Sequence, residues 1–318
     1  MKRKGNLYEN MLKIENIEQA YREVTKNTRN ERRVFEMKQY KTSYIAHVYE
    51  MLVNETYEVG KYNIFYVKEP KLRKIVSQGI IDKIINHLVA RYILYPALIP
   101  SLEEINVASR INKGTSAGLK YEQEFLRKCN VKYKDYYILK GDIHHFFQSI
   151  DHDVLKEKLK NKIKDKRALK MVFDIIDSNI EGLYIGAMTN QALAIFYLDA
   201  MDKFIKEELK IKYYIRYQDD FLLFHPNKDY LRYCLKEIEE FLKKEKLTLN
   251  PKTRIYKNTN NFTFLGRNPK NRYVRYRNTK RKLKAKKYMY ETSQIDLYSL
   301  CCSYNCYETL LNKQSIKI

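Results

Sequence analysis

Two adjacent aspartates between apolar segments constrain the fold of this chain more than any other feature. Asp219 and Asp220 follow the mostly apolar residues 211–217 and precede a second apolar run, Phe221 to Phe224. Two short apolar runs separated by polar turn residues predict a β-hairpin with both carboxylates at its tip. Adjacent carboxylates repel each other, and a divalent cation relieves that repulsion. For an isolated Asp-Asp pair, an ordinary polar turn is the alternative, because aspartate is a favoured turn residue.

A further acidic residue, Asp142, favours the metal interpretation. Residues 136–139 predict a strand that delivers Asp142, and the aromatic pair Phe146-Phe147 follows. Carboxylates on neighbouring strand ends can hold two metal ions about 4 Å apart, an arrangement that serves phosphoryl transfer. We expect two Mg²⁺ ions, with Mn²⁺ as the other candidate. Taken alone, Asp142 is equally compatible with capping the segment that follows it.

The charge balance indicates an anionic partner. The 318 residues include 61 Lys and Arg against 38 Asp and Glu, which gives a formal net charge of +23. Such a charge demands an anionic partner or a large self-repulsion, and nucleic acid is the usual partner. A solvated, lysine-rich surface is the alternative. Hydrophobic residues make up 44% of the chain, enough to bury the core of one large domain or of two to three subdomains.

Cysteine usage and hydropathy bear on the compartment. The five cysteines have neither the spacing of a disulfide framework nor that of zinc ligands, so we expect reduced thiols and a cytoplasmic location. The basic N-terminus is not followed by the apolar region of a signal peptide. The longest uncharged run, Gly182 to Leu198, is shorter than a membrane span of about 20 residues, and we expect no membrane association.

Helical and strand-like segments follow one another without strict alternation, which predicts an α+β fold with antiparallel strands. We expect two helices within 15–53 and further helices over 80–98, 116–129, 153–163, 166–178, 188–209 and 229–245. We expect strands over 62–67, 72–76, 136–139, 211–217, 221–224, 253–257 and 262–265.

Six motifs in a fixed order resemble those of the bacterial reverse transcriptases, over about residues 60–270. Tyr217-Gln218-Asp219-Asp220 resembles the family's Tyr-x-Asp-Asp box, and Asp142 with Phe146-Phe147-x-Ser149-Ile150-Asp151-His152 resembles its motif A. The other matched segments are Pro70-Lys71-Leu72-Arg73, Arg110-x-x-Lys113-Gly114-Thr115, Asn250-Pro251-Lys252-Thr253 and Phe264-Leu265-Gly266. Each motif alone is weak evidence, whereas six in the same order are highly specific.

The resemblance implies a right-hand polymerase fold, with fingers, a palm built on an antiparallel sheet and a small helical thumb. It divides the chain into a helical N-terminal extension (1–60), fingers and palm (61–270) and a small basic thumb or C-terminal region (271–318). It also implies an RNA-directed DNA polymerase, which extends a DNA or RNA primer along an RNA template with dNTPs. For the basic C-terminal residues, a solvated tail is the alternative.

The resemblance also implies roles for the residues around the predicted metal ions. Asp142 and Asp219 would be the principal ligands, supported by Asp220 and by the backbone carbonyl of Ile143. Lys252 would protonate the leaving pyrophosphate. Being an exposed, solvated lysine is the alternative for Lys252.

The same resemblance assigns the substrate contacts. Lys71 and Arg73 would hold the triphosphate, and Arg110, in the second finger motif, is a further substrate-binding candidate. Phe147 would exclude a ribose 2′-hydroxyl and so favour dNTPs. Solvated cations at Lys71 and Arg73, and a plain core residue at Phe147, are the alternatives. Phe264-Leu265-Gly266 would grip the primer end.

The segment Gly182–Gln191 resembles motif B and supplies three more substrate-binding candidates, Ile185, Gly186 and Gln191. Many reverse transcriptases have glutamine where Ile185 stands. An aliphatic residue there is similar to the enzymes of diversity-generating retroelements, in which it accompanies misincorporation at template adenines, and to some antiphage relatives. Asn190 and Gln218 depart from the commoner residues and leave the subfamily open.

Two biological roles therefore stay open. In a diversity-generating retroelement we expect an accessory protein as partner, and in antiphage defence we expect a structured noncoding RNA. Two other classes are a catalytically inactive RNA-binding protein and a metal-dependent nuclease. The intact acidic residues argue against the first, because carboxylates without metal would repel RNA. The finger motifs and the aromatic gate argue against the second.

Overall fold

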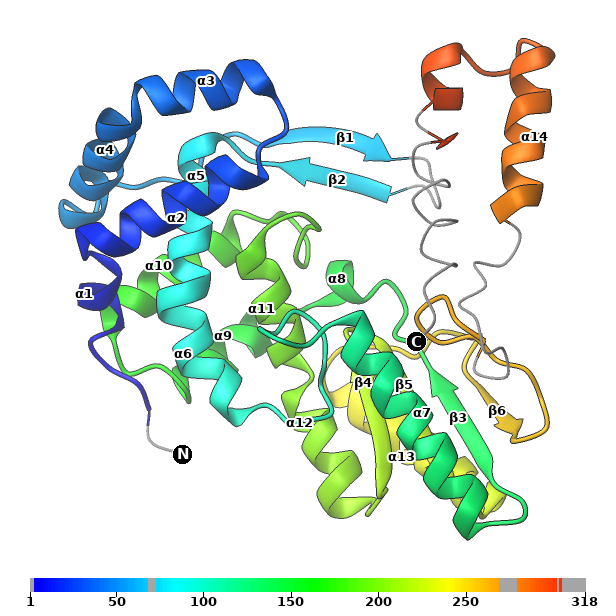
Figure 1. Cartoon of the computed structure of the whole chain (residues 1–318). Helices are drawn as coiled ribbons and strands as arrows, with labels where there is room; N and C mark the ends of the chain where they lie inside the picture. Colours follow the sequence, from blue (N-terminus) through cyan, green and yellow to red (C-terminus); the bar gives the residue numbers. More distant parts are fainter. Residues whose placement is uncertain (1–2, 68–72, 269–278, 302, 305–318) are drawn as a thin grey trace.

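The computed structural model of this chain describes residues 3–67, 73–268, 279–301 and 303–304. It is built of helices and antiparallel strands (Figure 1), which confirms the predicted α+β class. The α-helices are α1 Leu7–Met11, α2 Ile14–Asn27, α3 Glu31–Gln39, α4 Lys41–Val53, α5 Ile80–Leu88, α6 Tyr95–Leu98, α7 Thr115–Lys132, α8 Phe146–Ser149, α9 His152–Lys160, α10 Lys166–Asp177, α11 Met188–Tyr197, α12 Asp199–Lys203, α13 Lys228–Lys244 and α14 Thr279–Glu291. The strands are β1 Asn63–Val67, β2 Arg73–Ser77, β3 Tyr137–Gly141, β4 Tyr213–Tyr217, β5 Asp220–His225 and β6 Arg254–Lys257.

The main sheet has four strands in the order β4-β5-β3-β6, and every neighbouring pair is antiparallel. Phe221 to Phe224 of β5 are all buried, because helix α7 and helix α13 pack against the strands of this sheet. Figure 1 shows these two helices alongside the strands. A strand buried on both faces requires a continuous apolar run rather than alternation, and that is the pattern of β5.

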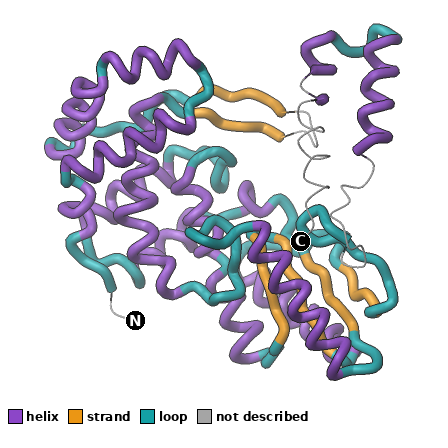
Figure 2. Tube along the Cα trace, viewed as in Figure 1, coloured by secondary structure: helices purple, strands orange, loops and turns teal. Residues whose placement is uncertain are grey.

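The helical half of the molecule surrounds α5 and α11, as Figure 2 shows in purple. Helix α2 buries Ile17, Ala20 and Val24 along one stripe and packs against α5. Residues at these spacings lie on one face of a helix, so burying that face docks the N-terminal helices onto the rest of the protein. After α5 the chain continues through a π-helical turn, Val89–Leu94, into α6.

A second, two-stranded sheet lies apart from the main one (Figure 1). Strands β1 and β2 form an antiparallel hairpin with Asn63 opposite Ser77. The base of this hairpin contacts the 182–187 loop, where the Val76 amide donates to the Ile185 carbonyl at 3.4 Å. Gly186, with φ 138°, lies so close that a Cβ there would be 2.5 Å from the Val76 carbonyl oxygen. Only glycine fits this contact.

Two helix predictions are wrong in their number of segments. Residues 15–53 hold three helices rather than two, because the Asn30 side chain accepts a hydrogen bond from the Arg33 amide and starts a new helix. The helix expected over 188–209 is interrupted at Leu198, where φ is −90° and ψ is 7°. Side-chain caps compete with helix continuation, and the periodicity of apolar residues does not register that competition.

The strand predicted over 262–265 is also absent. Phe264 and Arg267 exchange two backbone hydrogen bonds of 2.9 Å, and Leu265 has φ 48°. This left-handed residue turns the chain sharply and prevents an extended strand. The strand expected from residue 211 begins at Tyr213. Within the described residues, no helix combines the length and apolar character needed to cross a membrane.

Candidate active site

Strand register brings the three predicted aspartates to one edge of the main sheet. Strands β3 and β5 are antiparallel with Gly141 opposite Phe221, so Asp142 leaves β3 beside Asp220 at the start of β5. Tyr217 pairs with Asp220 and closes the β4–β5 hairpin. Asp219 lies in its turn, which is the hairpin expected from the sequence.

Gly141 allows these strands to approach. A Cβ at this position would lie 2.1 Å from Cζ of the Phe221 ring, which covers the backbone there. Any larger residue would push β3 away from β5 and would carry Asp142 with it. The small residue before Asp142 is therefore part of the positioning of the carboxylate.

The carboxylates of the site repel one another electrostatically. The pKa of Asp219 is raised to about 6, mainly by burial. The charge of Asp142 contributes to this increase, and the charge of Asp220 contributes less. Burial likewise raises the pKa of Asp220 to about 6, with Lys140 opposing the shift and Asp142 adding to it. Repulsion among buried carboxylates is the condition that a bound cation relieves.

Two polar side chains contact the carboxylates. Asn250 donates from Nδ2 to Oδ2 of Asp142 at 2.8 Å, and its amide donates to the Asp142 carbonyl at 2.7 Å. Lys140 Nζ lies 3.4 Å from Oδ1 of Asp220, an oxygen that is buried without a hydrogen bond. Asn250 belongs to a predicted motif, but its contact with Asp142 was not foreseen.

The donor chemistry fits divalent cations of the Mg²⁺ type. Asp142, Asp219 and Asp220 carry carboxylate oxygens, and the predicted fourth ligand, the backbone carbonyl of Ile143, is also an oxygen; both are hard ligands. In the described part of the chain, however, no three His, Cys, Asp or Glu side chains converge as a closed metal-binding cluster. Asp142 and Asp220 instead contact Asn250 and Lys140, respectively.

Sequence reasoning missed a buried ion pair beneath the hairpin. Arg216 and Asp202 are both fully buried, and Arg216 Nε donates to Asp202 Oδ1 at 2.7 Å. Arg216 Nη1 donates to the Gln218 carbonyl at 2.8 Å, so the guanidinium connects the turn that holds Asp219 to α12. Tyr214 donates to the same Asp202 at 2.6 Å. The available signal was an arginine within an otherwise apolar strand.

A second network joins the turn to Gln191 of the predicted motif B and to Ser109, the residue before the second finger motif. Gln218, held at φ 56°, donates from Nε2 to Oγ of Ser109 at 2.8 Å. Ser109 in turn donates to Oε1 of Gln191 at 3.3 Å. The turn of the Tyr-x-Asp-Asp segment, the loop before α7 and the first turn of α11 thus share one chain of hydrogen bonds.

The predicted triphosphate-binding residues are placed unequally. Lys71 lies outside the described residues, and Arg73 begins β2, although its side chain is outside the described part. Arg110 donates from Nη1 to the carbonyls of Glu103 at 2.7 Å and Asn106 at 3.0 Å, and so stabilises its own loop. To contact a substrate, Arg110 would have to leave these carbonyls.

The other candidates contact neighbours of their own. Phe147 is half-buried and contacts Phe146 edge to face, with ring centres 5.7 Å apart. Lys252 is exposed, and its amide donates to the side chain of Asn250 at 3.0 Å. Ile185 and Gly186 lie at the contact with β2 described above. These residues keep their predicted roles as proposals.

The predicted primer-grip segment is a tight turn supported from below. Phe264 is fully buried, whereas Leu265 is half-buried and Gly266 is exposed. Arg267, just after the turn, faces the Gln123 side-chain amide, whose oxygen accepts from Nη1 and Nη2 at 2.5 Å when the amide is turned to match these donors. Only Leu265 and Gly266 can reach a ligand, while Phe264 and Arg267 anchor the turn to α7.

A buried acid lies under this turn. Glu122 is fully buried, and neither carboxylate oxygen has a hydrogen-bond partner. Burial raises its pKa to about 8, and the charges of Arg267 and Lys140 oppose this shift. Glu122 is therefore largely protonated at neutral pH and acts as a neutral group between the primer-grip turn and the palm sheet.

This fold and site define a template-dependent polymerase of the palm-domain class. The family model for reverse transcriptase (RNA-dependent DNA polymerase) matches residues 67–268, about two-thirds of the chain. The chain therefore belongs to the reverse transcriptase family, whose members are nucleotidyltransferases that depend on divalent metal ions. A search of curated proteins finds no match.

Solved structures share the fold. Apo telomerase from Candida tropicalis, truncated from its C-terminal domain, superposes with a TM-score of 0.52 at 16% identity, over 65% of this chain and 52% of that one. Telomerase from the same organism, in complex with a fragment of telomeric RNA, superposes with a TM-score of 0.53 at 15% identity, over 80% and 53%. The chain thus spans about half the length of these telomerases, and the likeness shows the right-hand polymerase fold.

Proposed function

We propose that this protein synthesises DNA on an RNA template, with Asp142, Asp219 and Asp220 holding two Mg²⁺ ions. The observation that carries the proposal is the β3–β5 register, which sets Asp142 beside the Asp219-Asp220 turn. The raised pKa values of Asp219 and Asp220 support it, because they mark carboxylates that a cation would stabilise. When bound, the metal ions would supply charge neutralisation at the reacting phosphate.

The surrounding residues take the following parts in this proposal. Asn250 orients Asp142, and the backbone carbonyl of Ile143, the residue after Asp142, serves as a further ligand. Phe147 packs under the sugar and disfavours a 2′-hydroxyl. Lys252, exposed beside Asn250, donates a proton to the leaving pyrophosphate. Positioned charge of this kind accelerates phosphoryl transfer without covalent chemistry by the protein.

The substrate contacts come from the fingers and from motif B. Lys71 and Arg73 hold the triphosphate, Arg110 joins them after leaving its loop carbonyls, and Ile185, Gly186 and Gln191 line the nucleotide position. Leu265 and Gly266 support the primer end above Phe264. The helical extension (1–60), the fingers and palm (61–270) and the basic C-terminal region (271–318) are the proposed divisions of the chain.

The biological setting follows from motif B. The aliphatic Ile185 favours a diversity-generating retroelement, in the bacterial cytoplasm, with an accessory protein that helps to hold the RNA. Antiphage defence with a structured noncoding RNA is the second candidate, because the departures at Asn190 and Gln218 leave the subfamily open. An accessory gene with template and variable repeats next to the coding gene indicates the first, and a defence island with a noncoding RNA gene indicates the second.

Primer extension tests the central proposal. The purified chain receives an RNA template with an annealed DNA primer, Mg²⁺ and dNTPs, in parallel with Asp219→Ala/Asp220→Ala. Asp229→Ala is the matched control, since Asp229 is exposed on α13 and pairs only with Arg232. We expect extension by wild type and control and none by the double variant. Preferential misincorporation at template adenines supports the retroelement setting.

Inactivity of the wild type calls for a second arm with the products of the neighbouring genes added. Inactivity of wild type in both arms, with retained RNA binding, overturns the polymerase proposal in favour of an inactive RNA-binding protein. Mg²⁺-dependent cleavage of the template without extension identifies a nuclease instead.

A further inference from the structure

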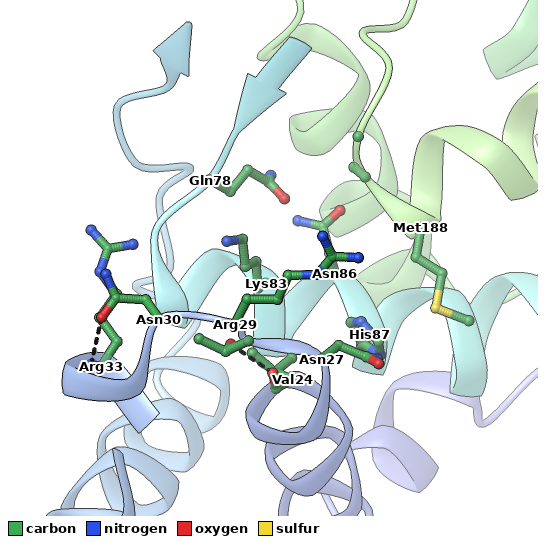
Figure 3. Close-up of a pocket in the computed structure, with 13 residues that line it drawn as sticks. Val24, Asn27, Arg29, Asn30, Arg33, Gln78, Lys83, Asn86, His87 and Met188 are labelled. Atoms are coloured by element: carbon green, nitrogen blue, oxygen red, sulfur yellow. Dashed lines mark hydrogen bonds between the residues drawn. The ribbon is translucent and has the colours of Figure 1, made fainter. Parts of the chain in front are cut away.

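A cavity lies where the N-terminal helices meet the fingers, away from the carboxylate edge. It has a volume of about 320 Å³ and is lined by the α2–α3 connection, by the α5 region and by the residues that lead into α11 (Figure 3). Gly186 and Met188 form part of its wall. The cavity therefore borders the proposed motif B segment on one side and the N-terminal extension on the other.

Basic side chains line the cavity, and its described lining contains no acidic side chain to neutralise them. Arg29, Arg33 and Lys83 line it. Within the described chain, none of these three cations forms a salt bridge. His87, also in the wall, differs because it lies 3.2 Å from Glu23. Three unpaired cations around one hollow repel each other unless an anion joins them.

Burial and charge both act on the lysine of this group. Burial lowers the pKa of Lys83, and the nearby Arg33 guanidinium lowers it further. An anion between them would reverse the second effect. Lys83 rises from α5 toward Gln78 in Figure 3, and Arg33 lies across the cavity on α3.

A buried amide adds a neutral donor. Gln78 is 5% exposed, lines the cavity and points into it in Figure 3. Its Nε2 makes no hydrogen bond of good geometry, and the side chain lies beside the Tyr184 hydroxyl. A buried N–H group without an acceptor is costly, so the cavity presents charged and neutral donors that a multi-oxygen anion satisfies together.

We propose that this cavity is a phosphate-binding site for single-stranded RNA, in which Arg29, Arg33 and Lys83 hold one backbone phosphate outside the carboxylate edge. Guanidinium groups match phosphate oxygens in a forked geometry, and an ammonium adds a point charge. A hollow of about 320 Å³ has room for a phosphate group. The choice of RNA as the molecule that bears this phosphate rests on the proposed function. The phosphate site itself does not, since a free nucleotide presents the same phosphate chemistry.

The test compares two double variants of the full chain that lose equal charge. Arg29→Gln/Lys83→Gln removes two cations from the cavity. Lys26→Gln/Lys38→Gln removes two exposed cations from α2 and α3, outside the lining. Binding of a 5′-fluorescein 12-nucleotide oligo(U) RNA is followed by anisotropy without Mg²⁺ or dNTPs, over a range of NaCl concentrations, and ATP binding is measured by calorimetry.

We expect the cavity variant to bind RNA about tenfold more weakly than the control at 0.1 M NaCl, with a salt slope smaller by about 0.7, the value for one single-strand phosphate contact. Equal RNA and ATP binding by both variants overturns the site. Loss of ATP binding with unchanged RNA binding retains the phosphate site and rejects RNA as its carrier. The single variant Lys83→Arg keeps the positive charge and should bind RNA as the wild type does, with an unchanged Tm. This result would assign the loss in the double variant to charge and not to folding. The assay requires no turnover, so an inactive polymerase leaves it interpretable.

Discussion

The carboxylate edge and the cationic cavity both collect like charges, but they hold them by different means. At the edge, Asp142 and Asp220 have short side chains whose positions are set by the β3–β5 register. In the cavity, Arg29 and Arg33 are exposed and carry their charge at the ends of long, flexible side chains.

This difference has physical consequences. Burial and repulsion raise the pKa of Asp219 and Asp220. The ionised carboxylates therefore lower the free energy of unfolding, while the strands fix their positions. Arg29 and Arg33 keep their charge by remaining partly in water, and their long side chains can adjust in position. The first arrangement suits chemistry at a fixed point, and the second suits binding of a mobile chain. The following predictions test this contrast.

The largest effect is expected at the carboxylate edge. Asp219→Asn should lower primer extension by at least about thousandfold, because the ligand charge is lost. The same change should raise the free energy of unfolding at pH 8 by about 1–2 kcal/mol, since a buried carboxylate with a raised pKa is removed. Extension assays and thermal unfolding measure the two effects. An unchanged or lower Tm contradicts the account of an edge that sacrifices stability.

The next effect concerns the support below the turn. Arg216→Met leaves Asp202 charged and buried without its partner, and should lower the free energy of unfolding by about 3–5 kcal/mol. Urea unfolding measures this loss. Arg216→Met/Asp202→Leu should recover part of it, because the unpaired charge is gone. A double variant less stable than the single one contradicts the ion-pair explanation.

A pH-dependent effect is expected at Glu122. Its pKa in the folded protein, about 8, lies above its ordinary value of 4.5, so the folded state holds a proton that the unfolded state releases between these values. Wild-type stability should therefore fall as pH rises from about 5 to 8, by on the order of 3 kcal/mol. Glu122→Gln should flatten this dependence in Tm measurements. Parallel pH profiles for the two proteins count against a buried, neutral Glu122.

The smallest effect belongs to the cavity. Inorganic phosphate at 10 mM should raise the Tm of the wild type by about 1–2 °C relative to chloride at equal ionic strength, because ligand binding stabilises the folded state. Arg29→Gln/Lys83→Gln should lose this increment, and Lys26→Gln/Lys38→Gln should keep it. An equal increment in all three proteins assigns the effect to non-specific anion stabilisation.

Local patterns were sufficient to predict the parts of the site that depend on neighbouring residues. The apolar runs on both sides of Asp219 and Asp220 predicted the hairpin, and the strand before Asp142 predicted its position at a strand end. Both follow from period and turn chemistry, which a short window of sequence contains.

The supporting contacts could not be predicted in this way. Asn250 contacts Asp142, which lies 108 positions earlier in the chain. Arg216 on β4 contacts Asp202 on α12. The cavity joins residues from α2, α3, α5 and the start of α11. Such contacts depend on how elements pack in three dimensions, and local propensity carries no information about that packing. The turn at Leu265 was missed for a related reason, because a left-handed conformation at a leucine has no sequence signal.

The contact between Gly186 and Val76 connects the β1–β2 ribbon to the loop before α11. The ribbon meets this loop at the Ile185–Gly186 peptide. Because Gly186 has no side chain, Val76 packs directly against the backbone of this peptide. Under the proposed function, the position of the β1–β2 ribbon and the position of the peptide beside the incoming nucleotide therefore depend on each other.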